Sequence, residues 1–282
     1  MNEKYCAGIV LYNPEIKRLE ENISKISKQV KQLILIDNKS NNIEEIKKVI
    51  SKYNNIELIE NKNNMGIAYA LNQILDFSKS KKYTWFLTLD QDSVSDENLI
   101  YQYDNFINLT KDKRIACITC NIIDRNFKEK KMDKKIKYKY IKYCITSGAL
   151  MNVEALTKIN GYDDKMFIDK VDCDVCVNLI EKGYNIIQIN YNGLLHEVGH
   201  AKEINIVFRK WILYNHNSKR RYFMCKNAVY LVKKYKKNKY VKKIFLKELF
   251  HTIMVLIFEE NRKQKLKAAL NGFKDGFKEG AN

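Results

Sequence analysis

The chain has 282 residues and a formal net charge of +18, with 51 Lys and Arg against 33 Asp and Glu. Its hydrophobic content of 45%, which includes 18 Tyr and 12 Phe, excludes a disordered chain and predicts a globular protein with a large core. The longest apolar run near the C-terminus, residues 253–258, is too short to span a membrane. The seven cysteines are an odd number and no export signal is visible, so we expect reduced thiols in a cytoplasmic protein.

Apolar strands alternate with helical patterns through the first half of the chain. In chain order we predict a strand at 5–12, a helix at 15–30, a strand at 33–36, a helix at 43–53, a strand at 56–59, a helix at 67–78, a strand at 83–89, a helix at 97–109 and a strand at 115–123. The strands are apolar throughout, which is typical of a parallel sheet that helices cover on both faces. Further on, a helical pattern at 171–182 ends at Gly183, and a strand follows at 184–189. The sequence therefore predicts an α/β fold with a mainly parallel central sheet.

Polar side chains follow each of the first four predicted strands. Asn13 follows the first, Asp37 the second, residues 60–66 the third, and Asp90 and Asp92 the fourth. Because ligands of open α/β sheets bind at the carboxyl ends of the strands, these residues predict one binding edge. Ordinary loop polarity would account for the Asn and Ser residues, but it explains less well a carboxylate directly after a buried strand. Carboxylates suit Mg²⁺ or Mn²⁺, which typically bridge to phosphate oxygens, so a metal-held diphosphate is the favoured interpretation.

Three further features narrow the choice of ligand for this edge. Neither a G-x-G-x-x-G fingerprint nor a Walker A sequence is present, so we expect a nucleotide-diphosphate donor and not NAD or ATP hydrolysis. The small pair Ser147 and Gly148 would let backbone approach a ligand, and His196 after a strand is either a third metal ligand or a hydrogen-bonded structural residue. The spacing of Cys117 and Cys120 superficially suggests zinc, but a strand directs these side chains to opposite faces, and we interpret the cysteines as packed thiols.

The motifs together resemble the inverting glycosyltransferases of family 2, which have the GT-A fold, and most of all their bacterial rhamnosyltransferase branch. The matching segments, in chain order, are GIVLYNP, IDNKS, NNMGIAYALN, LTLDQDS, SGALM, FIDKVDCDVCVNLIEKGY, His196, RRYFMCKNAVYL and ALNGFKDGF. They cover almost the whole chain, and LDQDS resembles the rhamnosyltransferase form of the family's D-x-D motif. The resemblance implies transfer of a sugar, rhamnose first, from a dTDP- or UDP-sugar to a glycan or lipid-linked saccharide in cell-surface polysaccharide synthesis.

The resemblance also implies roles for individual residues. The donor would be bound by Tyr12, Asn13, Asp37, Asn64, Gly66, Asp90 and Gln91, with Asp37 on the base of the nucleoside. The metal, Mn²⁺ or Mg²⁺, would be held by Asp90 and Asp92, with His196 as the third ligand. The acceptor side would include Ser147, Gly148, Asp174 and Arg221. The implied domains are a catalytic domain at 1–205, divided into a nucleotide-sugar-binding half at 1–123 and an acceptor half at 124–205, and a basic, mostly helical C-terminal region at 206–282.

Asp172 falls where the family places its catalytic base. The preceding residue is Val171, where the family usually has Glu, and Asp174 supplies a second acid two residues later. On a helix of 3.6 residues per turn, the two side chains point about 200° apart, so both cannot face one anomeric carbon. The resemblance selects Asp172 as the base that deprotonates the acceptor hydroxyl.

Positive charge is concentrated in one tract. Residues Arg209–Lys247 contain 14 Lys and Arg and no acid, which leaves only +4 for the rest of the chain. A second basic stretch, Phe127–Lys142, has eight Lys against Glu129 and Asp133. Aromatic and aliphatic residues are interleaved with the cations of the tract, as in helices that bind anionic membrane surfaces, although a solvated lysine-rich face is an equal alternative. We expect a protein of the cytoplasm, peripheral on the inner face of the plasma membrane.

Two other classes of protein compete with this interpretation. A nucleic-acid-binding protein would explain the basic charge, but carboxylates at strand ends would repel phosphate unless a metal bound them, so we expect no nucleic-acid partner. A nucleotidyltransferase would share the sheet and the acidic metal site, but it usually has a Gly- and Arg-rich loop after the first strand, where this chain has Tyr12, Asn13 and Pro14.

Overall fold

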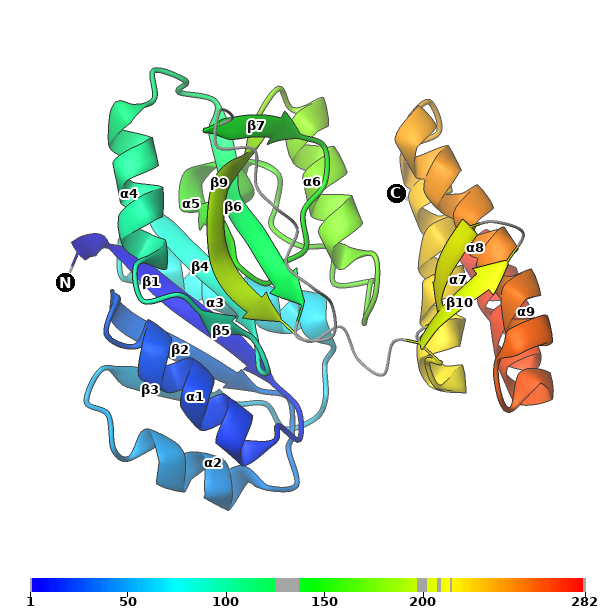
Figure 1. Cartoon of the computed structure of the whole chain (residues 1–282), viewed down its shortest axis with the longest axis horizontal. Helices are drawn as coiled ribbons and strands as arrows, with labels where there is room; N and C mark the ends of the chain where they lie inside the picture. The colour runs from blue at the N-terminus through cyan, green and yellow to red at the C-terminus, as the bar shows by residue number, and fades with distance from the viewer. Residues whose placement is uncertain (1, 125–136, 197–201, 207–208, 214, 281–282) are drawn as a thin grey trace. The chain divides into compact units, whose positions relative to one another are not determined.

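The computed structural model describes residues 2–124, 137–196, 202–206, 209–213 and 215–280 (Figure 1). The chain forms two compact units. The first, called here the sheet unit, comprises residues 1–165 and 172–197, and the second, the helical unit, comprises 166–171 and 198–282. The functional division at residues 205 and 206 stays a prediction. Of the basic stretch Phe127–Lys142, residues 127–136 lie outside the described part of the chain.

The sheet unit is built on a mixed nine-stranded sheet whose strands follow the order β3-β2-β1-β4-β8-β6-β9-β5, with β7 paired to β9. Its elements are β1 (Asn2–Leu11), α1 (Ile16–Ile26), β2 (Val30–Asp37), α2 (Ile43–Ile50), β3 (Ile56–Glu60), α3 (Ile67–Ser80), β4 (Trp85–Asp90), β5 (Val94–Ser95), α4 (Leu99–Leu109), β6 (Ile115–Asp124), β7 (Tyr138–Ile141), β8 (Ala149–Asn152), α5 (Val153–Lys158), α6 (Val171–Glu181) and β9 (Asn185–His196). The pairs β1–β2, β1–β4, β2–β3 and β6–β9 are parallel, and β8 runs antiparallel to β4 and β6. The predicted α/β architecture, helices flanking a mostly parallel sheet, is confirmed.

Some predicted boundaries are wrong, and each error has a physical reason. The helix predicted to reach residue 30 ends at Ile26, because buried Val30 already begins β2 beside β1. The strand predicted to end at 189 continues to His196, because β9 stays paired with β6 as far as Asp124. Strands β5, β7 and β8 were not predicted, since stretches of two to four residues are too short to establish a period.

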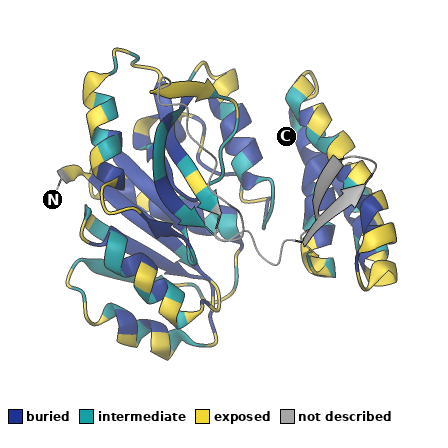
Figure 2. Ribbon diagram, viewed as in Figure 1, coloured by how far each residue is buried: buried dark blue, intermediate teal, exposed yellow. Residues whose placement is uncertain are grey.

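The sheet is covered by helices on both faces. One face of β1, formed by Tyr5, Ala7, Ile9 and Leu11, belongs to a continuous buried core with residues of α1, α2 and α4 (Figure 2). On the other face α3 lies against Gly8, where an added Cβ would be 2.5 Å from the Ile74 side chain. Gly8 therefore permits a contact that any larger residue would prevent, and this contact fixes α3 beneath the strands that form the binding edge.

The helical unit contains an antiparallel pair of strands and a group of helices. Its elements are β10 (Lys202–Ile206), β11 (Arg209–Leu213), α7 (Ser218–Lys234), α8 (Lys239–Phe258) and α9 (Arg262–Lys278). Helices α7 and α9 pack closely at two glycines of the ALNGFKDGF segment. A Cβ at Gly272 would lie 2.3 Å from the Tyr222 carbonyl oxygen, and one at Gly276 would lie 2.6 Å from that of Lys226. Among the described residues, no helix is both long and apolar enough to cross a membrane.

Buried ion pairs join the helices of this unit. Arg221 and Glu248, both almost fully buried, form a salt bridge of 2.8 Å, and Lys170 approaches the other oxygen of Glu248 at 3.1 Å. Glu259 lies 3.8 Å from Arg221 and 2.8 Å from Lys265, which is also buried. Buried charges are tolerated only when they are paired and hydrogen-bonded, so this network fixes the packing of α7, α8 and α9.

The segment 166–171 is held in an uncommon backbone conformation by α7. Asp169 and Lys170 both have positive φ, 66° and 65°, which costs energy for residues with a side chain. Asn227 donates from its side-chain amide to the carbonyl oxygens of Ile168 and Asp169, at 2.9 and 2.8 Å, and Arg220 pairs with the Asp169 carboxylate at 3.1 Å. Arg220 and Asn227, both in the RRYFMCKNAVYL segment, therefore hold the backbone of residues 166–171, a role that the sequence did not reveal.

Candidate functional site

The ends of β1 and β2 are tied together at the predicted binding edge. The backbone amide of Asn13 donates to Ser40 Oγ at 2.8 Å, and the Asn13 side-chain oxygen accepts from the Asn41 amide at 2.7 Å. Asn13 has a φ of 48°, a left-handed conformation that Asn tolerates better than most residues. The turn after β1 therefore has a fixed shape, and it leaves Tyr12 half-exposed at the edge.

Asp37 is a buried carboxylate with one unused oxygen. It is the last residue of β2 and only 1% exposed. Its Oδ2 accepts from the Ser40 amide at 2.9 Å, whereas its Oδ1 is buried without a hydrogen-bond partner among the described residues. Because an unsatisfied buried acceptor costs free energy, this oxygen is suited to receive an N–H donor from a bound molecule.

The loop after β3 is fixed by Asn38, a residue that the sequence analysis did not select. Its side-chain amide donates to the Gly66 carbonyl at 3.1 Å, and its oxygen accepts from Asn61 at 3.0 Å. Gly66, with φ 89°, precedes the first turn of α3, and its amide donates to Asn64 Oδ1 at 3.0 Å. The predicted donor residues Asn64 and Gly66 thus lie together in a shaped loop beside the end of β2.

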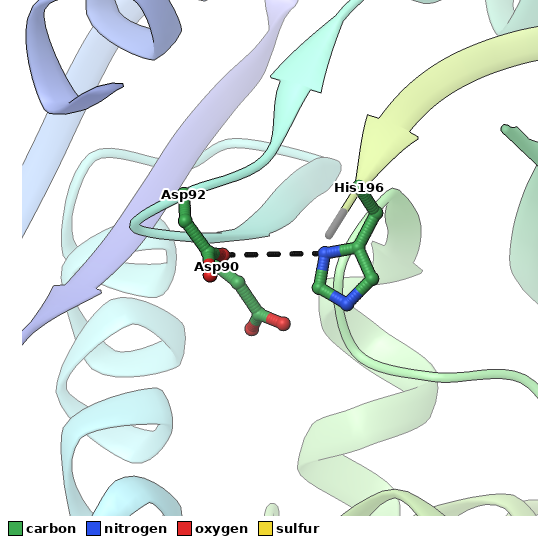
Figure 3. A group of neighbouring side chains, drawn as sticks. All are labelled: Asp90, Asp92 and His196. Carbon is green, nitrogen blue, oxygen red and sulfur yellow. Dashed lines mark ion pairs between the residues drawn. The ribbon is translucent and has the colours of Figure 1, made fainter. Parts of the chain in front are cut away.

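Asp90, Asp92 and His196 form one cluster (Figure 3). Asp90 ends β4, Asp92 follows in the next turn, and His196 ends β9. One ligand atom from each residue lies within 4.8 Å of the other two, and Asp92 Oδ1 is 4.0 Å from His196 Nδ1. In the described part of the chain, this is the one group of three or more His, Cys, Asp and Glu side chains arranged to hold a metal ion.

A chain of hydroxyl groups supports the cluster from behind. The Asp90 amide donates to Ser147 Oγ at 2.9 Å, Ser147 Oγ lies 2.8 Å from Ser93 Oγ, and Ser93 Oγ lies 2.8 Å from His196 Nδ1. Both serines are fully buried. Ser147 was predicted on the acceptor side, together with Gly148, and that role stays a prediction. Ser93 was missed, because a serine in an acidic turn has no distinguishing pattern.

The donor set fits a hard divalent cation. Two carboxylates and one imidazole match the ligands that Mn²⁺ accepts, and carboxylates also suit Mg²⁺. All three side chains are only partly buried, so the cluster is accessible to a diphosphate. A metal bound there would neutralise negative charge that develops on a departing nucleoside diphosphate.

Gln91 joins the cluster to the first strand. Its side-chain oxygen accepts from the Tyr12 amide at 2.8 Å, and its amide nitrogen lies 3.4 Å from the Tyr12 carbonyl oxygen. The D-x-D segment is also anchored from α1, where Asn22 donates to the Asp90 carbonyl at 2.9 Å. The middle residue of the motif therefore connects two strand ends.

Asp172 lies in the first turn of α6, and both of its carboxylate oxygens have partners. Oδ1 accepts from the Cys173 amide at 2.8 Å, and Oδ2 accepts a short hydrogen bond from the Tyr143 hydroxyl. Burial and the nearby Asp172 carboxylate raise the pKa of Tyr143 far above its usual range, so Tyr143 stays protonated and donates. Asp172 is partly accessible, whereas Asp174 is 2% exposed. Tyr143 was missed, because it lies outside every recognised motif.

Two other predicted features have definite positions. Arg221, expected on the acceptor side, is buried in the helical unit, where it pairs with Glu248 and Glu259, and its proposed role stays untested. All seven cysteines are free thiols. Cys117 and Cys144 lie with their sulfurs 3.5 Å apart; Cys117 is buried and Cys144 is partly buried.

Comparison with known proteins identifies the family. The model of Glycosyl transferase family 2 matches residues 6–160, more than half of the chain. The chain is also 25% identical, over 295 residues, to the dTDP-rhamnosyl transferase RfbF of Shigella flexneri; the match covers 99% of this chain and 97% of that protein.

Solved structures show the same fold at low sequence identity. The mannosyltransferase PcManGT from Pyrobaculum calidifontis, in complex with GDP-Man and Mn²⁺, has a TM-score of 0.61 and 13% identity, covering 99% of this chain and 76% of that one. S. aureus TarS 1–349, in complex with UDP-GlcNAc, has a TM-score of 0.60 and 12% identity, covering 97% and 81%. The expected GT-A fold is thereby confirmed. With the acidic cluster at the carboxyl edge of its sheet, the chain belongs to glycosyl transferase family 2 and is a nucleotide-sugar glycosyltransferase.

Proposed function

We propose that the protein transfers rhamnose from dTDP-rhamnose, with inversion, to a saccharide acceptor of cell-surface polysaccharide synthesis. The observation that carries the proposal is the Asp90, Asp92 and His196 cluster, at the sheet edge where Asp37 presents its unpartnered oxygen. The choice of donor is supported by the similarity to a dTDP-rhamnosyl transferase over nearly the whole chain.

The donor residues divide into a nucleoside part and a diphosphate part. Asp37 would accept a hydrogen bond from the thymine N–H through its buried oxygen, and Tyr12 and Asn13 would form the wall beside the base. Asn64 and Gly66 would line the pocket at the end of the neighbouring strand. A thymine or uracil ring carries an N–H donor that can satisfy this acceptor, which is consistent with a dTDP- or UDP-sugar.

The diphosphate would be held through Mn²⁺ or Mg²⁺ by Asp90, Asp92 and His196. Because Ser93 contacts His196 Nδ1, we assign Nε2 as the ligand nitrogen. The serine pair would then orient the imidazole, as hydrogen-bonded partners of metal ligands generally do.

The acceptor hydroxyl would lose its proton to Asp172. Tyr143 and the Cys173 amide hold the carboxylate in one orientation, so that it does not have to be ordered during the reaction. Ser147, Gly148 and Asp174 would complete the acceptor side within the sheet unit, and the expected role of Arg221 toward the acceptor stays a separate proposal for the helical unit. The acceptor would be a glycan or a lipid-linked saccharide, which would place the enzyme at the inner face of the plasma membrane.

The donor assignment can be tested by thermal shift. The full chain is heated with dTDP-rhamnose, UDP-glucose, GDP-mannose, NAD or ATP, each with Mn²⁺. A ligand that binds the native state raises the melting temperature by mass action, and we expect the largest increase with dTDP-rhamnose. An increase with NAD or ATP alone would reject the proposal. Release of pyrophosphate from dTTP and a sugar phosphate would instead support a nucleotidyltransferase.

The metal role requires its own comparison. We expect EDTA to abolish transfer and Mn²⁺ or Mg²⁺ to restore it, and Asp92→Ala to lose the metal-dependent part of dTDP binding. Asp76→Ala is the matched control, because it removes an exposed carboxylate of α3 that is not part of the Asp90, Asp92 and His196 cluster. Full transfer in EDTA would leave Asp90 and Asp92 as direct donor contacts only.

A further inference from the structure

The outward face of α8 has an uncommon composition. Ten residues of this helix are exposed among those whose burial the structure describes, and each is either lysine or apolar: Lys239, Lys242, Lys243, Leu246, Lys247, Leu249, Phe250, Ile253, Ile257 and Phe258. A solvated helix face normally mixes acids, amides and cations. The ten exposed residues include no acid and no amide, so contact with water alone does not explain their composition.

Lysine and apolar residues are separated along the helix. The four lysines lie in its N-terminal half, whereas every described exposed residue of the C-terminal half is apolar. The most accessible apolar residues are Leu246, just before the last lysine, Ile253 and Ile257, at 62%, 55% and 53%. These three residues are spaced at i, i+7 and i+11, so they fall on one narrow stripe of a helix with 3.6 residues per turn. The stripe is therefore continuous and not a scatter of single apolar residues.

The positive charge of this face is not compensated on α8 itself. The one acid between Lys239 and Phe258 is Glu248, which points inward and is buried against Arg221 and Lys170. Lys236 and Lys237, in the turn before α8, are also exposed. An anionic partner would therefore meet at least six exposed lysines, together with an apolar stripe.

We propose that this surface, called here the α8 face, docks on an anionic lipid bilayer and lies in its interface. The lysine half would contact phosphate headgroups, and Leu246, Ile253 and Ile257 would enter the boundary between headgroups and acyl chains. The inference rests on the proposed function only in that a lipid-linked acceptor would be found there.

The α8 face differs from the basic tract that the sequence predicts. Within Arg209–Lys247, Arg221 is buried in ion pairs, and Lys233 donates to the Phe277 carbonyl at 2.7 Å. These cations are occupied inside the unit. The face begins near the end of the tract and extends beyond it to Ile257, where the apolar stripe ends.

Two other partners fit the α8 face less well. A second copy related by a two-fold axis across the middle of α8 would set the apolar half of each helix against the lysine half of the other. Nucleic acid would use the lysines but would leave Leu246, Ile253 and Ile257 without a contact, because phosphate backbones recruit cations and bases recruit aromatic or polar groups. A bilayer uses both halves.

Vesicle flotation of the full chain, without donor or acceptor, tests the inference. We expect binding to vesicles of phosphatidylglycerol and phosphatidylcholine at low salt, and release at high salt because exposed charges are screened. Each exposed lysine is worth roughly fivefold in partitioning. Lys242→Gln with Lys243→Gln should therefore weaken binding about 25-fold, whereas Lys17→Gln with Lys48→Gln, exposed lysines of α1 and α2, should leave it unchanged.

The apolar stripe is tested separately. Ile253→Gln with Ile257→Gln should weaken binding at least tenfold and reduce its remaining part to a purely salt-sensitive attraction. Leu109→Gln with Tyr101→Gln, which removes two exposed apolar side chains from α4, is the matched control and should bind normally. Circular dichroism and thermal unfolding of each variant verify that the fold is retained.

Several results would overturn the inference. Equal binding to neutral and anionic vesicles would reject the inference. Undiminished vesicle binding by both α8 variants would reject it as well. Conversion of a dimer to a monomer by Ile253→Gln with Ile257→Gln, seen by sedimentation velocity while vesicle binding stays intact, would make the face a self-interface. Donor-induced thermal stabilisation is measured independently, so an enzyme that binds dTDP-rhamnose but not vesicles would reject the α8 proposal alone.

Discussion

Replacement of Asp172 by Asn separates the proposed chemistry from the structure that supports it. The side chain keeps its size, and its Oδ1 can still accept from the Cys173 amide, which donates to Asp172 Oδ1 at 2.8 Å in the parent. The new amide group replaces Oδ2 and can donate to the Tyr143 oxygen, so the local hydrogen bonds survive with one direction reversed. What Asp172→Asn removes is the ability to accept a proton.

The expected loss follows from that difference. General-base catalysis contributes about 10²- to 10⁴-fold, so Asp172→Asn should raise the activation barrier by about 3–5 kcal/mol. Because the substitution leaves the donor edge unchanged, the affinity for dTDP-rhamnose and Mn²⁺ should stay within a few-fold. An interaction used only in the transition state lowers kcat and kcat/KM together.

The assay is transfer of labelled rhamnose to a saccharide acceptor, with donor binding measured in parallel by calorimetry. Asp174→Asn is the matched variant: it lies two residues along the same helix, but its carboxyl is 2% exposed, so we expect a lower melting temperature and a nearly normal kcat. If Asp174→Asn lost 10²-fold or more while Asp172→Asn stayed active, the base would be Asp174.

Three further predictions concern residues that the structure brings into focus. Tyr143→Phe removes a hydrogen bond that favours the ionised Asp172, so the acidic limb of the kcat–pH profile should move to higher pH; an unmoved limb would show that the hydroxyl does not tune the base. Gly272→Ala should force α7 away from α9, because the added Cβ would lie 2.3 Å from a backbone oxygen, and lower the free energy of unfolding by about 1–3 kcal/mol in urea titrations; an unchanged midpoint would show that the helices can separate freely. Glu248→Gln leaves two cations partly unpaired in the interior and should cost about 3–5 kcal/mol. Burial raises the pKa of Glu248, but the neighbouring cations outweigh it and the net pKa is lowered, so this stabilisation is present above about pH 4.3 and is lost as pH falls through the lower folded value. Melting curves from pH 6 to pH 3 should therefore fall less steeply for the variant than for the parent, and parallel curves would contradict the reasoning.

The sequence predicted the binding edge because its signals are local. Asp90 directly follows an apolar strand, and Asp37 follows another, so the strand-to-loop change is visible within a few residues. Parallel pairing of β1 with both β2 and β4 then follows from their uniform apolarity, and it places these strand ends side by side.

The rest of the cluster depends on contacts between distant segments. His196 reaches Asp92 only because β9 continues seven residues beyond its predicted end, and its pairing with the two-residue strand β5 has no sequence period to reveal it. Ser93 and Ser147 are 54 residues apart, and their hydrogen bond is a product of the fold. Tyr143 matters because its hydroxyl contacts Asp172, and hydrophobic periodicity cannot predict a contact between residues 29 positions apart.

The basic tract Arg209–Lys247 shows most clearly why counting charges in a sequence does not predict which of them are exposed on the surface. From sequence, Arg221, Lys233 and Lys242 are equivalent cations within one acid-free stretch. In the structure Arg221 is buried in an ion pair with Glu248, Lys233 donates to a backbone carbonyl at the end of α9, and Lys242 is exposed on α8. Lys242 is the most exposed of the three to salt, Lys233 is partly accessible, and Arg221 is buried. Screening acts on charges in contact with solvent and much less on buried pairs. The slope of vesicle binding against salt concentration should therefore report the exposed lysines around α8 and not the +14 of the tract; a slope that scaled with the whole tract would mean that the ion pairs of the helical unit open when the protein binds.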